Sequence, residues 1–352
     1  MFWASFVWRN KVYLKNSWYV GAWSHEVTRE PLQRFMLDEP LVFYRTNAGD
    51  PVALDDRCIH RFAPLSAGCL EGDNIVCGYH GFTYSPSGDC IAIPGVRQTP
   101  KKAKVKSYPV VEKWGWIWVW MGEKKKLDEA KIPDFHYLDD PDWGGKGDTL
   151  NLKCAYNLVY ENLLDLTHAK FVHKTTLATD DVTEFPLKVE EVDDTVVVQR
   201  KMFDIKSSPL FARAGGFTEA VDHRQHIIIT PPCYISINTT VKSSKNSSED
   251  KVADIRILNA LTPETSKTTN YFWNLVRCFA IDDEEMETFL YEGNKFAFSE
   301  DQAIIEQQQK MWDTMPSARP IPFPHDKGVI ASGRLMERLI SEEEKEITQA
   351  AE

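Results

Sequence analysis

The sequence of 352 residues has no apolar run approaching the ~20 residues that a membrane-spanning helix needs. It has no excess of basic residues either, since 41 Lys and Arg stand against 52 Asp and Glu, a net charge of −11. That balance disfavours binding to nucleic acid. At residues 1–11 (MFWASFVWRNK) the charges follow a short apolar run and no small-residue cleavage site comes after it, so we expect no secretory signal. We therefore expect neither nucleic acid nor a membrane as a partner.

The sequence has only seven cysteines, an odd number for a chain of this length, which does not suggest a disulfide framework. A reducing cytoplasm fits better, and in that compartment clustered cysteines usually serve metal or redox chemistry. The motifs GxGxxG and GxxxxGK[ST] are both absent, so the sequence shows no nucleotide or flavin site. Any redox chemistry would therefore draw its electrons from a separate protein.

The first part of the chain, residues 1–140, is predicted to be an all-β domain. Tryptophan recurs every second residue at positions 114, 116, 118 and 120, which predicts that all four lie on one packing face of a strand. Residues 122–143, rich in Lys, Asp, Glu and Pro, are typical of a domain boundary. The predicted strands are short runs of β-branched and aromatic residues between turn sequences, at 17–23, 40–44, 74–84 and 106–122.

The second part, residues 141–352, is predicted to be α+β. A helix is expected at about 152–172, and two more helices at about 282–313 and 328–350. A large antiparallel sheet flanked by helices is the simplest layer arrangement for such a pattern. The strands of that sheet are expected near 189–202, 224–241, 252–261 and 268–280.

A first cluster of metal-binding residue types lies between residues 58 and 80. Cys58-x-His60 and, sixteen residues later, Cys77-x-x-His80 form two tight pairs, each on a short loop next to a strand. Such ligands can hold a tetrahedral zinc ion, or a [2Fe–2S] cluster in which the cysteines bind one iron and the histidines the other. The spacing favours the cluster, because each loop carries one Cys and one His, whereas a zinc finger normally pairs like with like.

These loops resemble the ferredoxin-like Rieske domains of ring-hydroxylating and demethylating oxygenases. Rieske proteins of respiratory complexes add one cysteine to each loop, and those two form a disulfide. Ala63 and Tyr79 stand at the corresponding positions here, so that bridge cannot form. Cys69 and Cys90 lie elsewhere in the sequence, and we expect both to be buried structural thiols.

A second cluster lies in the expected helix, in the sequence YENLLDLTHAKFVHK. Glu161, Asp165 and His168 are spaced i, i+4 and i+7, so they would share one face of a helix. Carboxylate and histidine side chains that face an interior must be paired or bound to metal. His173 follows His168 by five residues, about 140° around an ideal helix, so both cannot reach one ion from regular geometry. We therefore predict that the helix ends after His168 or contains a π-type turn.

Two histidines leave an iron site incomplete, because Fe(II) in oxygenases usually binds two His and one carboxylate on one octahedral face. The run KFAFSEDQAIIEQQQ offers Glu300, Asp301 and Glu306 as the carboxylate. Glu306 would lie in a solvated stripe of a helix, and Glu300 falls between the two stripes. We predict Asp301, because helical periodicity places it on a mostly apolar stripe with Phe298, Ile304, Ile305 and Gln308.

Taken together, the motifs resemble the Rieske non-haem iron oxygenases, most closely the single-subunit type that includes vanillate and dicamba O-demethylases. The resemblance rests on Asn162-x-x-Asp165-x-x-His168-x-x-x-x-His173 and a late Glu-Asp pair, downstream of the two Cys/His loops. It covers nearly the whole chain. It implies an N-terminal all-β Rieske domain and a C-terminal helix-grip-like catalytic domain, within the two predicted domains.

The resemblance also implies a role for each residue of the two clusters. Asp165 would accept an N–H from His168 and couple the iron to the cluster of a neighbouring chain in a head-to-tail homotrimer. Asn162 would lie near the iron. The [2Fe–2S] cluster would be held by Cys58, His60, Cys77 and His80. The mononuclear iron would be bound by His168, His173 and Asp301.

The implied function is that of the oxygenase component of a monooxygenase. It would use O2, and electrons from NAD(P)H supplied through a ferredoxin, a flavin reductase or both, for the oxidative O- or N-dealkylation of a small aromatic compound. The alternatives are ring or benzylic hydroxylation by the same machinery, an electron-transfer Rieske protein, and a zinc-stabilised binding module. The later β runs offer His223, His226, Asn238 and Trp273 as pocket residues, and the sequence singles out none of them; a pair of lysines or an arginine there would indicate a carboxylate substrate.

Overall fold

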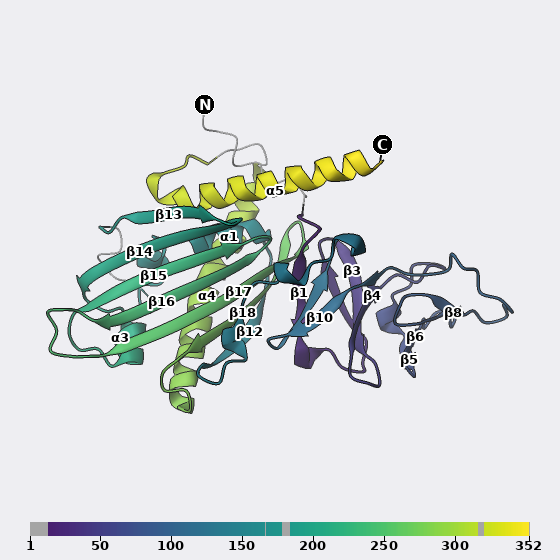
Figure 1. Ribbon diagram of the computed structural model, residues 1–352, viewed down its shortest axis with the longest axis horizontal. Helices are drawn as coiled ribbons and strands as arrows, with labels where there is room; N and C mark the ends of the chain where they lie inside the picture. Colours follow the sequence, from purple (N-terminus) through teal and green to yellow (C-terminus); the bar gives the residue numbers. More distant parts are fainter. Residues whose placement is uncertain (1–12, 166, 178–183, 316–319, 352) are drawn as a thin grey trace. The chain divides into compact units, whose positions relative to one another are not determined.

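The computed structural model shows two compact units (Figure 1). One comprises Lys15–Ile132 with Thr262–Ser266, and the other comprises Pro133–Leu261 and the described residues from Lys267 onward, with Tyr13 and Leu14. No helix in the described part of the chain is long and apolar enough to span a membrane. The domain boundary expected after residue 140 stays a prediction. The residues that the structure describes are 13–165, 167–177, 184–315 and 320–351.

The first unit is built from three small antiparallel sheets, ordered β1-β11-β10, β2-β3-β4-β9 and β5-β6-β7-β8. Its strands are short, as expected for a small all-β domain. They are β1 (Trp18–Trp23), β2 (Leu32–Met36), β3 (Glu39–Arg45), β4 (Pro51–Asp55), β5 (Cys69–Glu71), β6 (Asn74–Val76), β7 (Thr83–Tyr84), β8 (Cys90–Ala92), β9 (Ser107–Tyr108), β10 (Val110–Lys113) and β11 (Trp116–Trp120).

The alternating tryptophans lie at the centre of this unit. Trp116, Trp118 and Trp120 are fully buried on β11, where Trp118 pairs with Val20 of β1. The prediction that four tryptophans share one strand face is wrong for Trp114. That residue has a φ of 58° and, with Gly115 (φ 74°), forms the turn before β11. This left-handed turn places Trp114 outside the strand, so the alternation of buried tryptophans begins at Trp116.

The second unit contains a seven-stranded antiparallel sheet in the order β12-β18-β17-β16-β15-β14-β13 (Figure 1). The α+β class and the antiparallel sheet with flanking helices are confirmed. Residues 144–152 form an edge strand that the sequence did not predict, because three of its first four residues are glycines, which are depleted in strands. The strands are β12 (Gly144–Leu152), β13 (Leu187–Val192), β14 (Thr195–Ile205), β15 (Val221–Thr230), β16 (Tyr234–Ser243), β17 (Val252–Thr265) and β18 (Thr268–Arg277).

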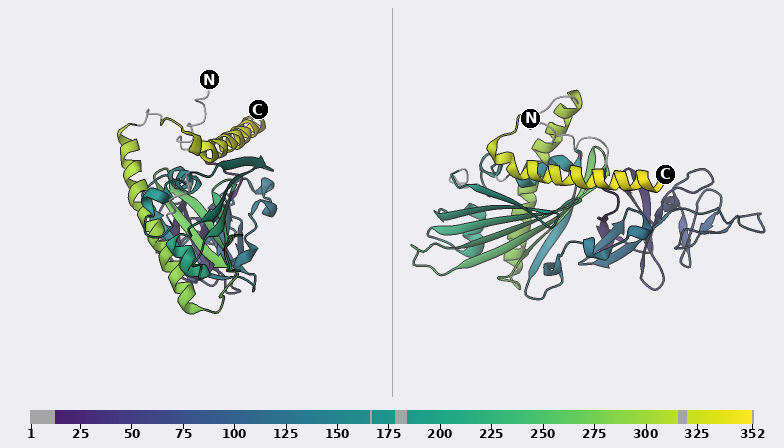
Figure 2. Two further views of the ribbon diagram at one scale, coloured as in Figure 1. Left: turned by 90° about the vertical axis from the view of Figure 1, so that its left-hand side faces the viewer. Right: turned by 45° about the horizontal axis from the view of Figure 1, so that its top comes forward.

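The helices pack against this sheet. The long helix α4 lies along one face and contacts β12 and β18, and α5 runs beside β13 and β14 (Figures 1 and 2). Asp283 caps α4 by accepting a hydrogen bond from the amide of Met286, and three glutamates occupy the first turn, which suits the helix dipole. The α-helices are α1 (Tyr156–Leu164), α2 (Ala169–Val172), α3 (Pro209–Gly215), α4 (Glu284–Thr314) and α5 (Lys327–Ala351).

Short 3-10 turns lie in several of the connections between strands and helices. Three of these turns lie within residues 122–143, the segment predicted to be a boundary. In chain order they are η1 (Ser24–Glu26), η2 (Leu65–Ala67), η3 (Lys124–Lys126), η4 (Glu129–Lys131), η5 (His136–Leu138) and η6 (Pro324–Asp326).

Candidate metal centres

The two Cys/His loops share one backbone pattern although their sequences differ. The amide four residues after each cysteine donates to that cysteine's carbonyl, from Phe62 to Cys58 at 2.8 Å and from Gly81 to Cys77 at 3.0 Å. This fourth residue is left-handed in both loops, with φ values of 55° at Phe62 and 69° at Gly81. A left-handed non-glycine residue costs roughly 1–2 kcal/mol. The first loop therefore adopts the same turn as the second without a glycine at this position.

The loops place their cysteines inside the protein and their histidines at its surface. Cys58 and Cys77 are 1% and 2% exposed and belong to the apolar core of the small unit. His60 and His80 are exposed, and their rings lie 4.6 Å apart. Burial raises the pKa of the Cys58 thiol, and the neighbouring Cys77 thiol raises it further. The ligands are thus sorted into a cysteine pair and a histidine pair.

The division into a cysteine pair and a histidine pair distinguishes a site for a two-iron cluster from a site for a single zinc ion. A tetrahedral zinc ion has bonds of about 2.0–2.3 Å, which keeps its four ligand atoms within about 4 Å of one another. Within the described part of the chain, only one set of three or more His, Cys, Asp or Glu ligand atoms lies within 4.8 Å, and it contains none of these four residues. A cluster with both cysteines on one iron and both histidines on the other fits the sorted pairs.

The other two cysteines of this region differ in burial. Cys90 is buried, as predicted, but Cys69 is exposed, so that prediction is wrong. β5 is a three-residue edge strand in which Leu70 packs against the core. Because successive side chains of a strand point to opposite faces, Cys69 turns to solvent.

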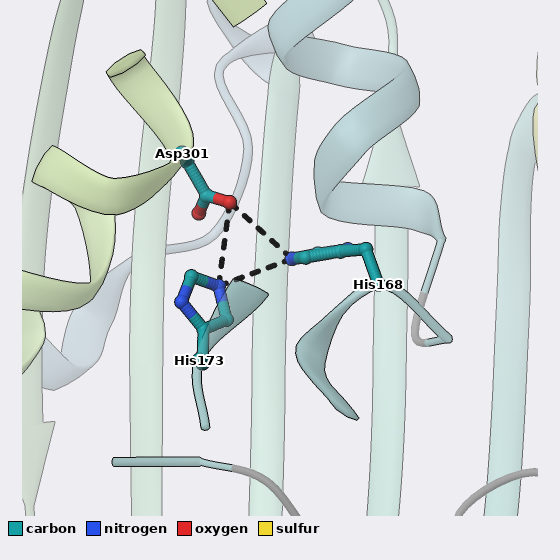
Figure 3. A group of neighbouring side chains, drawn as sticks. All are labelled: His168, His173 and Asp301. Atoms are coloured by element: carbon teal, nitrogen blue, oxygen red, sulfur yellow. Dashed lines mark hydrogen bonds and ion pairs between the residues drawn. The ribbon is translucent and has the colours of Figure 1, made fainter. Parts of the chain in front are cut away.

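The second centre is formed by His168, His173 and Asp301, whose side chains point toward one another (Figure 3). The two histidine Nε2 atoms lie 3.1 Å apart, and Asp301 Oδ1 lies 3.4 Å from His168 Nε2 and 3.3 Å from His173 Nε2. An octahedral ion with bonds of about 2.1 Å separates neighbouring ligand atoms by about 3.0 Å. The triangle therefore fits one face of an octahedral ion, the arrangement of an Fe(II) site with two His and one carboxylate.

The local backbone explains how two histidines five residues apart converge. α1 ends at Leu164, Asp165 is extended, and the single-turn helix α2 begins after His168 and ends before His173. The expected continuous helix over 152–172 is therefore wrong. The predicted break exists, but it lies before His168 rather than after it, and no π-type turn is present in the described residues.

Asp165 contacts His168 through a different atom from the one expected. The backbone carbonyl of Asp165, rather than its carboxylate, lies against Nδ1 of His168. The carboxylate Oδ1 accepts a hydrogen bond from the amide of Thr167 at 2.8 Å. The carbonyl therefore fixes the tautomer that presents Nε2 to a metal. The extended backbone after α1 makes this contact possible.

Asn162 holds the carboxylate ligand. Its Nδ2 donates to Asp301 Oδ1 at 3.1 Å, whereas its Oδ1 is buried without a hydrogen-bond partner among the described residues. Asp301 itself is 6% exposed. The amide thus orients the predicted ligand through its Nδ2.

Glu300 is the site residue that the sequence did not single out for a role. Its Oε2 lies 3.0 Å from Nδ1 of His173, on the side of the ring opposite Asp301. Burial lowers the pKa of His173, but Asp301 and Glu300 together outweigh burial and raise it. One imidazole therefore faces two carboxylates, and a dication among the three ligand atoms would balance their charge. The signal was the adjacent acidic pair, since metal-binding histidines usually donate to a carboxylate.

Two family descriptions match the chain. Residues 17–109 match the Rieske [2Fe-2S] domain, and residues 152–342, more than half of the chain, match the vanillate O-demethylase oxygenase C-terminal domain. The chain is a Rieske non-haem iron oxygenase. As in the rest of the family, its cofactors are a [2Fe–2S] cluster and a mononuclear iron at the His/His/Asp site. A Rieske protein that only transfers electrons is excluded.

This Rieske oxygenase has relatives along nearly its whole length. It is 34% identical to the toluene-4-sulfonate monooxygenase system iron-sulfur subunit of Comamonas testosteroni, over 94% of this chain and 98% of that protein. It is 32% identical to the vanillate O-demethylase oxygenase subunit of Pseudomonas sp. (strain HR199 / DSM 7063), over 94% and 96%. A crystal structure of dicamba monooxygenase bound to dicamba superposes with a TM-score of 0.87 and 32% identity, over 95% of this chain and 99% of that one.

Proposed function

We propose that this chain catalyses the oxidative O- or N-dealkylation of a small aromatic compound as the oxygenase component of a monooxygenase system. The observation that carries the proposal is the convergence of His168, His173 and Asp301 within 4.8 Å in a chain that also has the sorted Cys/His loops. Together these supply one site for oxygen activation and one for single-electron delivery. The vanillate O-demethylase relative supports dealkylation as the outcome.

In this proposal, each residue of the catalytic centre has a defined task. The iron, when bound, supplies the activation of O2 at the coordination positions that the protein leaves open. The metal is bound by His168, His173 and Asp301. Asn162 holds the Asp301 carboxylate, and Glu300 holds the His173 ring. The cluster ligands are Cys58, His60, Cys77 and His80.

The reaction follows from where oxygen is inserted. Hydroxylation of a carbon attached to an ether oxygen or an amine nitrogen gives a hemiacetal or a hemiaminal. That species collapses to an aldehyde and an alcohol or amine. For a methyl ether, one O2, two electrons and two protons give the phenol, formaldehyde and water. Two electrons must therefore reach the site in each turnover.

Those electrons come from a separate protein, because the sequence carries neither of the two nucleotide-binding motifs. We propose a flavin reductase as this partner, alone or with a ferredoxin, fed by NAD(P)H.

We also propose a homotrimer in which the Asp165 carboxylate couples the iron to a cluster histidine of the neighbouring chain. The carboxylate that His168 leaves free supports this role. The free thiols support a reducing cytoplasm as the location.

Benzylic hydroxylation is a second candidate, and one observation favours it. The 34% identical relative is named for toluene-4-sulfonate, whose ring carries a methyl group and no ether or amine. The same centre acting on a ring methyl group would give a stable alcohol and release no aldehyde by collapse.

Product analysis decides between the two candidates. The holoenzyme would be supplied with a generic ferredoxin and reductase and a panel of methoxy-, N-methyl- and methyl-substituted aromatics. Dealkylation predicts formaldehyde in a one-to-one ratio with oxygen consumed, and three irons per chain by elemental analysis. Benzylic alcohol without formaldehyde would transfer the assignment to the second candidate, and only two irons per chain would contradict both.

A further inference from the structure

A buried arginine near the iron-binding segment has two guanidinium nitrogens without a hydrogen-bond partner among the described residues. Arg200, on β14, is 4% exposed. Its Nε and Nη1 have no hydrogen-bond partner among the described residues. A guanidinium keeps its charge in proteins, and a buried charge without a partner is strongly destabilising. The position therefore calls for an anion that is not part of the described chain.

The register of the sheet shows what surrounds Arg200. It lies directly opposite Gln225 of β15, which in turn lies opposite Thr239 of β16. The three side chains form a polar row across three strands. The row on one side of it is apolar and consists of Val198, Ile227 and Ile237. The row on the other side consists of Met202, His223 and Val241.

This polar row belongs to the face of the sheet that the helices cover. A Cβ added to Gly328 of α5 would meet Val198 Cγ2 at 2.8 Å, and the ring of Phe211 of α3 lies 5.2 Å from that of His223. Because residues directly opposite each other in an antiparallel pair share a face, Arg200 and Gln225 point to the same side. Two more unused polar groups lie there, since Gln225 Oε1 and both ring nitrogens of His223 are buried without hydrogen-bond partners in the described structure.

Strands β14 and β15 lie next to the segment between Asp165 and Thr176, which carries both iron-binding histidines. At its beginning, Asp165 contacts His168 and acts electrostatically on Arg200. At its end, the amide of Thr176 donates to the carbonyl of His173 at 3.2 Å, and the Thr176 carbonyl accepts from Leu210 of α3 at 3.2 Å. The next residue of α3, Phe211, packs on His223 as described above. The polar row thus lies next to the metal centre on the same side of the sheet.

Asp165 does not serve as the direct counter-ion of Arg200. The two interact only through space, and Asp165 Oδ1 is occupied by the amide of Thr167. The polar side chains that neighbour Arg200 on this face, Gln225 and His223, are neutral, because burial lowers the pKa of His223 to about 4 and its imidazole is uncharged at pH 7. A flat oxyanion matches the two-pronged donor geometry of arginine.

We propose that Arg200 binds the anionic group of the substrate, with Gln225 and His223 completing its hydrogen bonds, so that the substrate is an aromatic carboxylate or sulfonate. The anionic end lies on the β14–β15 part of the sheet, and the alkyl group points to His168, His173 and Asp301. This assignment deepens the proposed function by naming the charge of its substrate.

Equilibrium binding to the full-length holoenzyme tests this proposal without turnover. The probes are 4-methoxybenzoate, 4-methylbenzenesulfonate and the neutral 4-methoxybenzamide, measured by calorimetry in the absence of O2. The variants are Arg200→Met, which keeps a long side chain without charge, and Arg200→Lys, which keeps the charge without the fork. Arg224→Met is the matched control, because Arg224 is exposed and lies one position along β15 from His223 and Gln225.

We expect the wild type to bind at least one acid about tenfold or more tightly than the amide. Arg200→Met should weaken acid binding about 30- to 100-fold and change amide binding less than threefold, with three irons per chain retained. Arg200→Lys should give an intermediate loss, and Arg224→Met none. Unchanged acid affinity in Arg200→Met overturns the proposal, as does a wild type that prefers the amide. If Arg200→Met fails to fold, unchanged acid affinity in Arg200→Lys overturns it.

Aldehyde release by the same preparations separates this inference from the proposed function. Acids that bind through Arg200 but release no aldehyde would contradict dealkylation and leave the anion site standing. Aldehyde release from neutral ethers, with no measurable binding of either acid, would contradict the anion site and leave dealkylation standing.

Discussion

Nδ1 of His173 lies 3.0 Å from Oε2 of Glu300, while Nε2 of the same ring lies 3.3 Å from Oδ1 of Asp301. Two consecutive residues of α4 therefore hold opposite edges of one imidazole. The histidine donates from Nδ1 to Glu300, which leaves the Nε2 lone pair directed at the metal position. The adjacent carboxylates have different tasks, since one binds the metal and the other orients a ligand.

Replacing Glu300 tests this division. Glu300→Ala should lower the affinity for the mononuclear iron by about 10- to 100-fold, the usual cost of losing a partner of a metal-bound histidine. Glu300→Gln should recover part of the loss, because its amide oxygen can still accept from Nδ1. Elemental analysis after dialysis against a chelator measures the iron. Glu292→Ala, an exposed position on the same helix, is the control and should keep three irons per chain.

The Asp165 contact makes a separate prediction about electron transfer. Because His168 uses the backbone carbonyl, Asp165→Asn should leave iron and cluster contents unchanged. Product formation should nevertheless fall more than tenfold, since the proposed route between cluster and iron loses its carboxylate. Stopped-flow oxidation of the reduced cluster in the presence of substrate and O2 measures the step. Iron loss in this variant, or full activity, would show that the carboxylate has another role.

The hydroxyl of Tyr84 lies 3.2 Å from Sγ of Cys58, one of the proposed cluster ligands. A hydrogen bond to a cluster sulfur stabilises the reduced, more negative state. Tyr84→Phe should therefore lower the cluster potential by about 60 mV, which corresponds to about 1.4 kcal/mol for one electron. Tyr44→Phe is the matched control, because Tyr44 is buried in the same core and its hydroxyl has no partner among the described residues. Equal shifts in both variants would contradict a specific effect on the sulfur.

His223 predicts a loss of stability in acid. Burial lowers its pKa to about 4 from an ordinary value of 6.5. Between these pH values the unfolded chain binds a proton that the folded chain does not, so stability falls as the pH falls from 6.5 to 4. The loss amounts to about 3 kcal/mol, at about 1.4 kcal/mol per pH unit. Chemical unfolding at pH 7 and pH 4 measures the free energy of unfolding. The wild type should lose about 3 kcal/mol more between these pH values than His223→Met, and an equal loss in both proteins would contradict the prediction.

The sequence predicted the features that depend on short-range spacing. In each Cys/His loop the cysteine and its histidine are two or three residues apart. The loops can therefore be recognised from this spacing even where the strand boundaries are predicted wrongly. Asp301 followed from helical periodicity, because α4 is long and regular over that region.

Features that depend on tertiary contacts were missed. α1 ends after Leu164 without a glycine, a proline or any other stop signal, because the backbone of Asp165 turns to meet His168. Glu300 lies between the two stripes of α4, and only the position of His173 gives it a partner. Arg200 lies opposite Gln225 only because of the register of β14 and β15, and the two residues are 25 apart in sequence. Periodicity within one element carries no information about such pairs.

The seven-stranded sheet and the metal-binding segments come from different parts of the chain, and this separation affects how the enzyme can diversify. All three iron ligands are supplied by the α1–α2 region and by α4, whereas the polar row of Arg200, Gln225 and Thr239 is supplied by strands alone. Exchanging side chains on β14 to β16 can therefore alter which molecule is selected and leave the oxidation chemistry intact. A relative of this protein can therefore gain a new substrate through a few substitutions on these strands while its metal-binding residues stay unchanged.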